Sequence, residues 1–235
     1  MKDTAKADGF ARTYGVELLC AERPAIDKRV LLGSLQRHCP AILPLDDHAD
    51  SGPLAFIHPD HKVRYADGSV PAQVFVAVAD GNLDPSMLEE PLQQSWGFPE
   101  ARARVASGRA TVLVSDLMAS GLPYRTRLAL FQRALAGVLE VVSAQAIRWS
   151  RAQQVIDPQA YLAALAEKAA PNLEAGAVNV RFFNLQDTNG EMLMDSLGLA
   201  ALGLCDVQCH FRDLDPGAVA GLLYGIAGYI FEKGD

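Results

Sequence analysis

The sequence predicts an α+β protein in which mixed or antiparallel sheets are covered by helices. Short apolar runs rich in valine and phenylalanine, typical of strands, occur in both halves of the chain. Segments with helical spacing lie between them, and several start at an Asp-Pro pair, which is typical of a helix N-terminus. Strand pairs mixed with helices favour this class. We expect residues 1–235 to form one compact domain, whose halves, 10–100 and 105–235, resemble two ferredoxin-like split units.

The first half is predicted to contain three strands and two helices. Asp27 can cap the first helix, and Asp84, followed by Pro85, can cap the second. The segment 46–53 carries several acids with a glycine and a proline, which is typical of an exposed loop, and a turn is expected at 58–61. The strands are expected at residues 14–20, 54–57 and 70–79.

The second half is predicted to contain five strands and three helices. Apolar residues recur with helical spacing over residues 124–141, and Asp157, which is followed by a proline, can cap a further helix. A tight polar turn at 187–190 connects two of the strands. The strands are expected at residues 110–114, 144–149, 178–185, 191–197 and 206–211.

The last helix is expected at residues 217–233, directly after the capping residue Asp215. Gly221 and Gly225 belong to a strip of glycines on this helix, which we interpret as a surface for close packing against the core. A leucine at either position is therefore expected to overpack the interface. The inward face is predicted to consist of Val219, Leu222, Leu223, Ile226 and Ile230.

Composition indicates a globular protein of the cytoplasm. Half of the 235 residues are hydrophobic and 21% are charged, which is an ordinary globular balance. No apolar run follows the lysines near the N-terminus, so we expect no secretory signal. The longest apolar stretch, 218–231, is too short to cross a membrane. The four cysteines are expected to be reduced thiols.

Known catalytic motifs are absent from the sequence. It contains no glycine loop for phosphate, and no glycine flanks Ser115 as a nucleophile elbow requires. Cys209 is next to His210, but adjacent strand residues point to opposite faces of a sheet. Cys39 is next to His38 at the end of a helix, which is not specific for catalysis. We therefore expect no catalytic residues and a protein that is not an enzyme.

Zinc is the best cofactor alternative, and the spacing of its candidate ligands is poor. Cys205, Cys209 and His210 are close in sequence, and so are His58 and His61. A C-x3-C pair on a strand would place the two thiols roughly 13 Å apart. We therefore expect no metal and no cofactor.

The charge distribution suggests a basic partner. The net charge is −7, and the segments 1–100, 101–170 and 171–235 carry −6, +5 and −6. Such a chain lacks the basic face that direct nucleic-acid binding needs. The outer segments could attract a basic protein, although a solvated acidic surface gives the same pattern. The candidate contacts are Asp46, Asp47, Asp50, Asp80, Asp84, Glu89 and Glu90.

The last third of the chain carries three distinctive stretches. They read NVRFFN at 179–184, MDSLGLAALGL at 194–204 and DVQCHFR at 206–212. Through these stretches, residues 100–235 resemble the bacterial family called domain of unknown function 4261. The family has no assigned activity, so the resemblance implies no catalytic residue. It implies an immunity or accessory role beside secreted toxins and type VI secretion genes.

Five polar residues stand among the apolar ones of these stretches: Arg181, Asp195, Asp206, His210 and Arg212. They either pair with each other and stabilise the fold or line a groove for a ligand or peptide.

Three functions are compatible with these observations. The first is an immunity protein that neutralises a cognate antibacterial toxin, such as a basic nuclease, in the cytoplasm. The second is an enzyme of unknown reaction that uses the region from Asp206 to His210. The third is a chaperone or adaptor that loads an effector onto a secretion machine. The first is our expectation.

Overall fold

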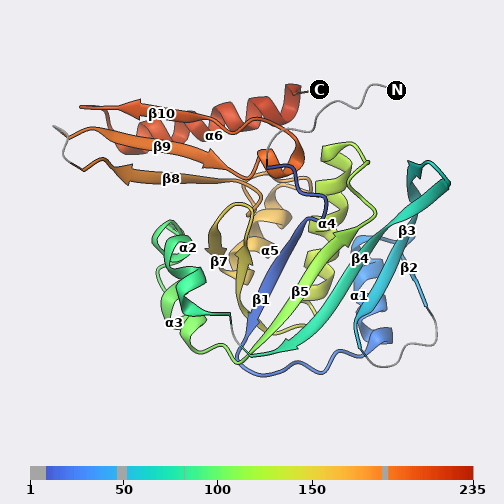
Figure 1. Cartoon of the computed structure of the whole chain (residues 1–235). Helices are drawn as coiled ribbons and strands as arrows, with labels where there is room; N and C mark the ends of the chain where they lie inside the picture. The colour runs from blue at the N-terminus through green and yellow to red at the C-terminus, as the bar shows by residue number, and fades with distance from the viewer. Residues whose placement is uncertain (1–8, 47–51, 82, 187–189, 235) are drawn as a thin grey trace.

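The computed structural model describes residues 9–46, 52–81, 83–186 and 190–234. It confirms the α+β class, because helices pack against a seven-stranded sheet and a separate three-stranded sheet (Figure 1). Most of the turn predicted at 187–190 lies outside the described residues.

The larger sheet is antiparallel throughout and has the order β2-β3-β4-β5-β1-β6-β7. The sequence predicted β1, β3, β4, β5 and β6, whereas β2 and β7 are too short to give a clear pattern. β3 also continues through the turn expected at 58–61, because a register shift after His58 accommodates these residues within the strand. The strands are β1 (Gly15–Cys20), β2 (Leu43–Pro44), β3 (Leu54–Tyr65), β4 (Gly68–Asp80), β5 (Ala110–Leu117), β6 (Ala144–Trp149) and β7 (Gln154–Ile156).

The two halves of the chain share this sheet. β1, from the first half, lies between β5 and β6 of the second half and pairs with both. Helix α4 (Tyr124–Leu139) connects β5 to β6, so β5-α4-β6 is a split β-α-β unit with β1 inserted in it. The structure therefore contains this one shared unit in place of the expected pair of ferredoxin-like halves. The pairing of β1 is long-range, so no local pattern in the sequence could reveal it.

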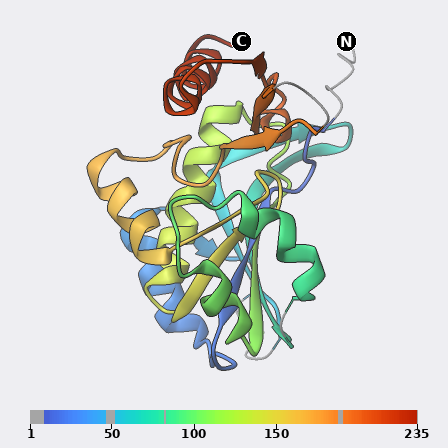
Figure 2. The same cartoon turned by 90° about the vertical axis from the view of Figure 1, so that its left-hand side faces the viewer.

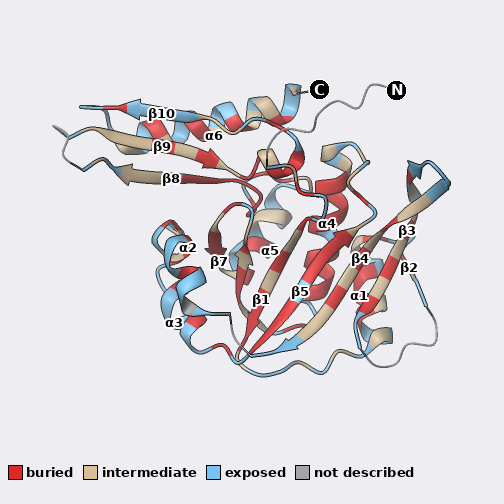
Figure 3. Ribbon diagram, viewed as in Figure 1, coloured by how far each residue is buried: buried red, intermediate tan, exposed pale blue. Residues whose placement is uncertain are grey.

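Helices cover the two faces of the larger sheet unequally. Helices α1 (Lys28–His38), α4 and α5 (Pro158–Glu167) lie together on one face (Figure 2). The main core lies under them, where the sheet and these helices are mostly buried (Figure 3). It includes a cluster of aromatic rings. Its members are Tyr14, Phe131, Trp149 and Tyr161.

The opposite face is covered in part by two short helices, α2 (Glu89–Gln93) and α3 (Ala101–Ala106). A short 3-10 helix, η1 (Pro85–Leu88), precedes α2. The buried residues of these segments pack on side chains of β1, β6 and β7, and the sequence had not indicated α3. These short helices begin at Asp84, which the sequence predicted as a helix cap. Its carboxylate accepts a hydrogen bond from the Ser86 N–H.

The three-stranded sheet carries the last helix. Its order is β10-β9-β8, with β8 (Asn179–Asn184), β9 (Met192–Leu197) and β10 (Gln208–Phe211), and a short 3-10 helix, η2 (Ala200–Leu202), follows β9. α6 (Pro216–Lys233) lies along one face of it, where apolar residues of strands and helix form a small core of their own. Asp215 caps α6 as expected, with its carboxylate accepting a hydrogen bond from the Ala218 N–H.

The face of α6 predicted to point inward is partly wrong. The helix buries Val219, Leu223, Ala227 and Phe231, whereas Leu222 and Ile226 are 58% and 37% exposed. The glycines also point away from the core: a Cβ atom placed on Gly221, Gly225 or Gly228 would meet no atom within 4 Å. Because this helix has almost no polar residues, its sequence contains no period that distinguishes the inner from the outer face. None of the helices in the described residues is both long and apolar enough to cross a membrane.

Glu140 links α1 to the end of α4. Its Oε2 lies 2.7 Å from Ser34 Oγ and 3.1 Å from Arg37 Nε, and its Oε1 lies 2.7 Å from His38 Nε2. The hydrogen bond from Ser34, with the contacts from His38 and Arg37, lowers the pKa of Glu140 to about 2. The two helices approach closely here, since a Cβ on Gly137 would lie 3.0 Å from the Cα of Leu35.

We expect Glu140→Gln to destabilise the protein at neutral pH but not in strong acid. The folded state lowers the pKa of this carboxyl, so its contribution is complete above about pH 4.5 and is lost as the pH falls toward 2. Because the side chain is a third exposed, we expect only about 1–2 kcal/mol at pH 7. Urea unfolding of the variant, the parent and an exposed control, Glu167→Gln, at several pH values tests this. A pH-independent difference would contradict the assignment.

Candidate functional site

The first acidic run predicted to bind a partner is described only at its start. Asp46 is exposed, and its backbone carbonyl accepts a hydrogen bond from the Lys28 ammonium group. Asp47 and Asp50 lie outside the described residues. The structure therefore leaves this part of the prediction open.

The second acidic run is engaged within the protein. Asp80 forms an ion pair with Arg23, and Asp84 caps η1. Glu89 accepts two hydrogen bonds of 3.0 Å from Arg102. Glu90 lies 3.1 Å from an Arg181 nitrogen. Since three of these four carboxylates already have a cationic partner, this surface is less negative than the sequence suggested.

Arg181 and Asp195 form an ion pair. This agrees with the first of the two interpretations given above, in which the polar residues pair with each other. They lie opposite each other on β8 and β9, with nitrogen–oxygen distances of 2.9 and 2.6 Å. Arg181 also donates a 2.7 Å hydrogen bond to Gln153 and stacks over Phe183. This arginine therefore links the small sheet to the segments that precede β7 and form α2.

The other three polar residues have partners of their own. Asp206 accepts hydrogen bonds from Ser196 Oγ at 3.1 Å and from the Leu199 and Ala200 N–H groups at 3.0 Å, so it holds the turn between β9 and η2. His210 lies 3.1 Å from Glu191, and Arg212 lies 3.6 Å from Asp213, all near the surface. A groove lined by these residues stays a prediction.

A different hollow lies between the two sheets, beside the loop of residues 94–98. The side chain of Gln94 forms hydrogen bonds with the backbone of Phe182 at the edge of β8. Its Nε2 donates to the Phe182 carbonyl at 3.1 Å, and its Oε1 accepts from the Phe182 N–H at 3.0 Å. Ser95 Oγ accepts a 2.7 Å hydrogen bond from the Val155 N–H of β7. The loop is therefore attached to both sheets, and its position is fixed.

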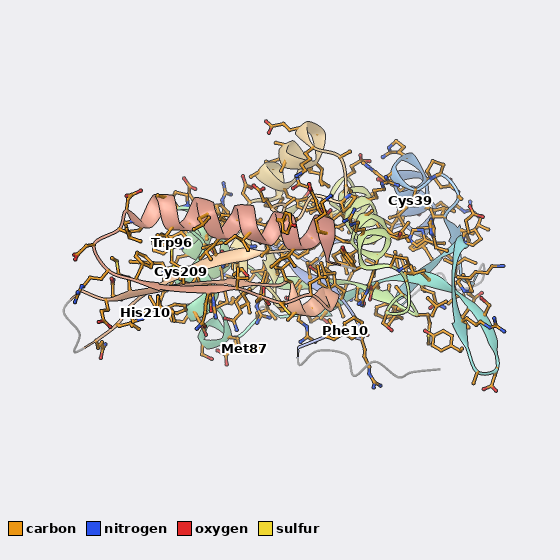
Figure 4. All side chains as sticks on the ribbon, turned by 90° about the horizontal axis from the view of Figure 1, so that it is seen from above. Phe10, Cys39, Met87, Trp96, Cys209 and His210 are labelled. Atoms are coloured by element: carbon orange, nitrogen blue, oxygen red, sulfur yellow. The ribbon has the colours of Figure 1, made fainter. Side chains whose placement is uncertain are left out.

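Trp96 projects from this fixed loop. Its side chain is 65% exposed, and its ring meets Phe182 edge-on at a centroid distance of 6.4 Å. Seen from above, it lies at the end of the molecule that carries His210, whereas Cys39 lies at the other end (Figure 4). Tryptophan is enriched among the residues that contribute most to binding at protein interfaces, so an exposed tryptophan on a fixed loop is a candidate contact.

The cleft beside Trp96 has a volume of about 230 Å³. Tyr224 of α6 and the buried Asn179 of β8 form part of its wall, and two acidic residues, Asp157 and Glu174, line it as well. The Tyr224 hydroxyl accepts a hydrogen bond of 3.4 Å from the Val180 N–H. Burial raises the pKa of Tyr224, and the negative charge of Glu174 adds to the shift.

The two carboxylates of this cleft differ from those of the acidic run. Asp157 accepts a 3.2 Å hydrogen bond from the Gln159 N–H at the start of α5. Within the described residues, neither Asp157 nor Glu174 forms a salt bridge with an arginine or a lysine. An exposed indole, a phenol and two carboxylates that have no arginine or lysine partner there can hold a cationic group in one small cleft.

No metal site emerges from the described residues, in which no three histidine, cysteine or acidic side chains are grouped to hold an ion. Cys205 is exposed and Cys209 is half-buried in β10. His58 is buried in β3, and burial, with a contribution from His61, lowers its pKa to about 4. The absence of a bound metal in the protein stays a prediction, which elemental analysis can test.

Sequence reasoning missed the Trp96 cleft because its walls come from four distant segments. The single local signal was a tryptophan followed by Gly97 in a loop between two helices. Glu174 and Tyr224 stand 78 and 128 positions after Trp96, and no spacing rule connects such residues.

The comparison with protein families gives one result. A domain of unknown function, DUF4261, matches residues 195–235. The match covers the second half of β9 and all of β10 and α6, and it supports the resemblance inferred from the sequence for this part of the chain. No curated protein and no solved structure matches significantly.

Proposed function

We propose that the protein is a non-enzymatic binding protein that captures a basic protein partner through the Trp96 cleft. One observation carries the proposal: an exposed indole on a fixed loop lies beside two carboxylates that have no arginine or lysine partner in the described residues. A lysine or arginine side chain fits this combination, because its charge is attracted both to the ring face and to the carboxylates. The volume of the cleft suits one such side chain.

The partner we propose is a cognate toxin, with this chain acting as its immunity protein in the cytoplasm. The resemblance to a family associated with secreted toxins and type VI secretion supports this role. The net charge of −7 supports a basic target, such as a nuclease, over direct contact with nucleic acid. An enzyme built on Asp206 and His210 has less support, because the Asp206 carboxylate is engaged by the turn after β9 and His210 is paired with Glu191.

We expect Trp96→Ala to weaken partner binding by about 30-fold, because a central aromatic contact of this kind contributes about 2 kcal/mol. Glu174→Lys should weaken binding by a similar factor through repulsion of the incoming cation. The partner is first recovered from the native host with the tagged wild-type chain, and its dissociation constant is then measured for each variant.

Met87→Ala is the matched control for the indole. Met87 is 54% exposed, lies in η1, which precedes α2 and the loop of Trp96, and does not line the cleft. Its replacement is expected to leave the affinity unchanged. Equal affinities of the wild-type chain and both cleft variants would remove the cleft from the proposal, and a partner that is acidic would contradict its chemistry.

A further inference from the structure

Two nearly buried side-chain amides form part of the wall of the Trp96 cleft. Gln154 of β7 and Asn179 of β8 line it and are 8% and 2% exposed. Within the described residues, neither amide oxygen has a hydrogen-bond partner, and neither is completely enclosed by the protein. Since both residues line the cleft, their oxygens are acceptors that a ligand in the cleft can reach.

The backbone fixes which atom of each amide is available. Gln154 Nε2 donates to the carbonyls of Gly176 and Val178 at 3.0 and 2.9 Å. Asn179 Nδ2 likewise lies 3.4 Å from each of two backbone carbonyls. A carbonyl oxygen cannot donate a hydrogen bond, so turning either amide over would place oxygen against oxygen. Each amide therefore keeps its oxygen unpaired, and it does so before any ligand binds.

The amide oxygens add to the acceptors already described in the cleft. Asp157 and Glu174 line it with carboxylates that have no arginine or lysine partner in the described part of the chain. Trp96, which is 65% exposed, adds a ring on which a planar group can stack. The acceptors come from four separate segments of the chain, so they surround the cleft from several sides.

We propose that the cleft is specific for arginine and that its occupant is an arginine side chain of the partner, with the guanidinium group stacked on Trp96. The proposal rests on the cationic site proposed above and narrows it to one residue type. A guanidinium group carries its N–H donors in one plane, so its edges reach acceptors on different walls while its face stacks on an indole. An ammonium group is more strongly hydrated and carries its donors on a single atom, so lysine leaves acceptors of the cleft unpaired.

The size and rigidity of the cleft fit one side chain. Its volume of about 230 Å³ is below the roughly 300 Å³ at which pockets for drug-sized ligands begin. Gln94 and Ser95 attach the loop of Trp96 to both sheets, so the cleft has its shape in the free protein. A preformed site loses little conformational entropy on binding. A single protruding arginine therefore suits it better than a larger ligand.

Titration of the full chain with three blocked amino acids tests the proposal. The probes are the N-acetyl amides of arginine, of lysine and of asymmetric dimethylarginine, which keeps the charge but lacks the donors of one nitrogen. Binding is followed by the indole N–H signal of Trp96 in a proton–nitrogen correlation spectrum. The chain has two tryptophans, and Trp96→Phe identifies the signal. Arginine should bind at least about 10-fold more tightly than either other probe.

Glu174→Gln is the matched variant. It keeps the shape of the side chain and removes one charge of the cleft, so it should weaken arginine binding by about 5-fold. Glu174 is exposed, and a thermal melt verifies that the variant folds. Glu167→Gln removes the same charge at an exposed position of α5 that does not line the cleft, and it should bind arginine like the wild type.

Three results would overturn the proposal. Equal affinities for arginine and lysine would leave a cationic site without specificity for arginine. Equal affinities for arginine and dimethylarginine would show that the acceptors of the cleft do not select the donors of the guanidinium group. A Trp96 signal that arginine does not shift would exclude the stacked complex. The effect of Trp96→Ala on the recovered partner is measured separately, so each of these failures is distinct from a failure of the proposed function.

Discussion

Replacing Arg127 by alanine is expected to destabilise the fold by about 3–5 kcal/mol, because it leaves the buried Asp116 carboxylate without its cation. Both residues are buried at the end of β5 and the start of α4. Arg127 donates to both oxygens of Asp116, and one of these contacts measures 2.9 Å. The same guanidinium donates a 2.7 Å hydrogen bond to the Ala11 carbonyl.

Asp116 extends this network to the start of β1, because its Oδ1 accepts a 2.8 Å hydrogen bond from the Tyr14 N–H. The pair therefore attaches the N-terminal segment to the sheet and to α4. Urea unfolding of Arg127→Ala measures the effect, and Arg133→Ala, at an exposed position of the same helix, is expected to change the free energy of unfolding by less than about 0.5 kcal/mol. A change below about 1 kcal/mol for Arg127→Ala would show that the pair contributes little.

Gly198→Ala is expected to cost about 3–5 kcal/mol as well. Gly198 has φ of +132°, a conformation that strains any residue with a side chain, and a Cβ there would lie 2.1 Å from the Ala177 carbonyl oxygen. Backbone would have to move, so the cost of overpacking adds to the cost of strain. The Gly198 N–H also points to Asp206, 3.4 Å away, so the change disturbs the turn that this carboxylate holds.

We expect Gly225→Ala to have the opposite effect on stability. This glycine lies within α6, and a Cβ there meets open space. Alanine is therefore expected to stabilise the fold by about 0.5–1 kcal/mol, because it reduces the backbone freedom of the unfolded chain. Thermal melts of the two variants should move in opposite directions. Equal losses would mean that the last helix packs through its glycine strip, as the sequence alone had suggested.

Features with a local cause were predicted from the sequence. The helix caps Asp27, Asp84, Asp157 and Asp215 each accept a hydrogen bond from an N–H of the following turn. Each prediction required only the capping residue and the residues directly after it. The apolar runs of β1, β4, β5 and β6 were found for the same reason, since strand pattern is visible within a few residues.

Features that depend on distant contacts were not predicted. The neutralisation of Glu90 requires Arg181, 91 positions later, and the neutralisation of Asp80 requires Arg23, 57 positions earlier. A count of acidic residues could not show these ion pairs, and the acidic run as a partner surface stays a prediction. The cleft beside Trp96 was missed for the same physical reason, because it exists only where the loop 94–98 meets β7, β8 and α6.

Site-specific photocrosslinking tests the central claim most directly. A photoreactive benzophenone amino acid is placed at position 96, or at position 87 as the control, and cells of the native host that express either chain are irradiated. We predict one dominant crosslink from position 96, formed with a basic protein next to a lysine or an arginine, and little crosslinking from position 87. Crosslinking of one partner from position 87 but not from position 96 would contradict a cationic binding site beside Trp96.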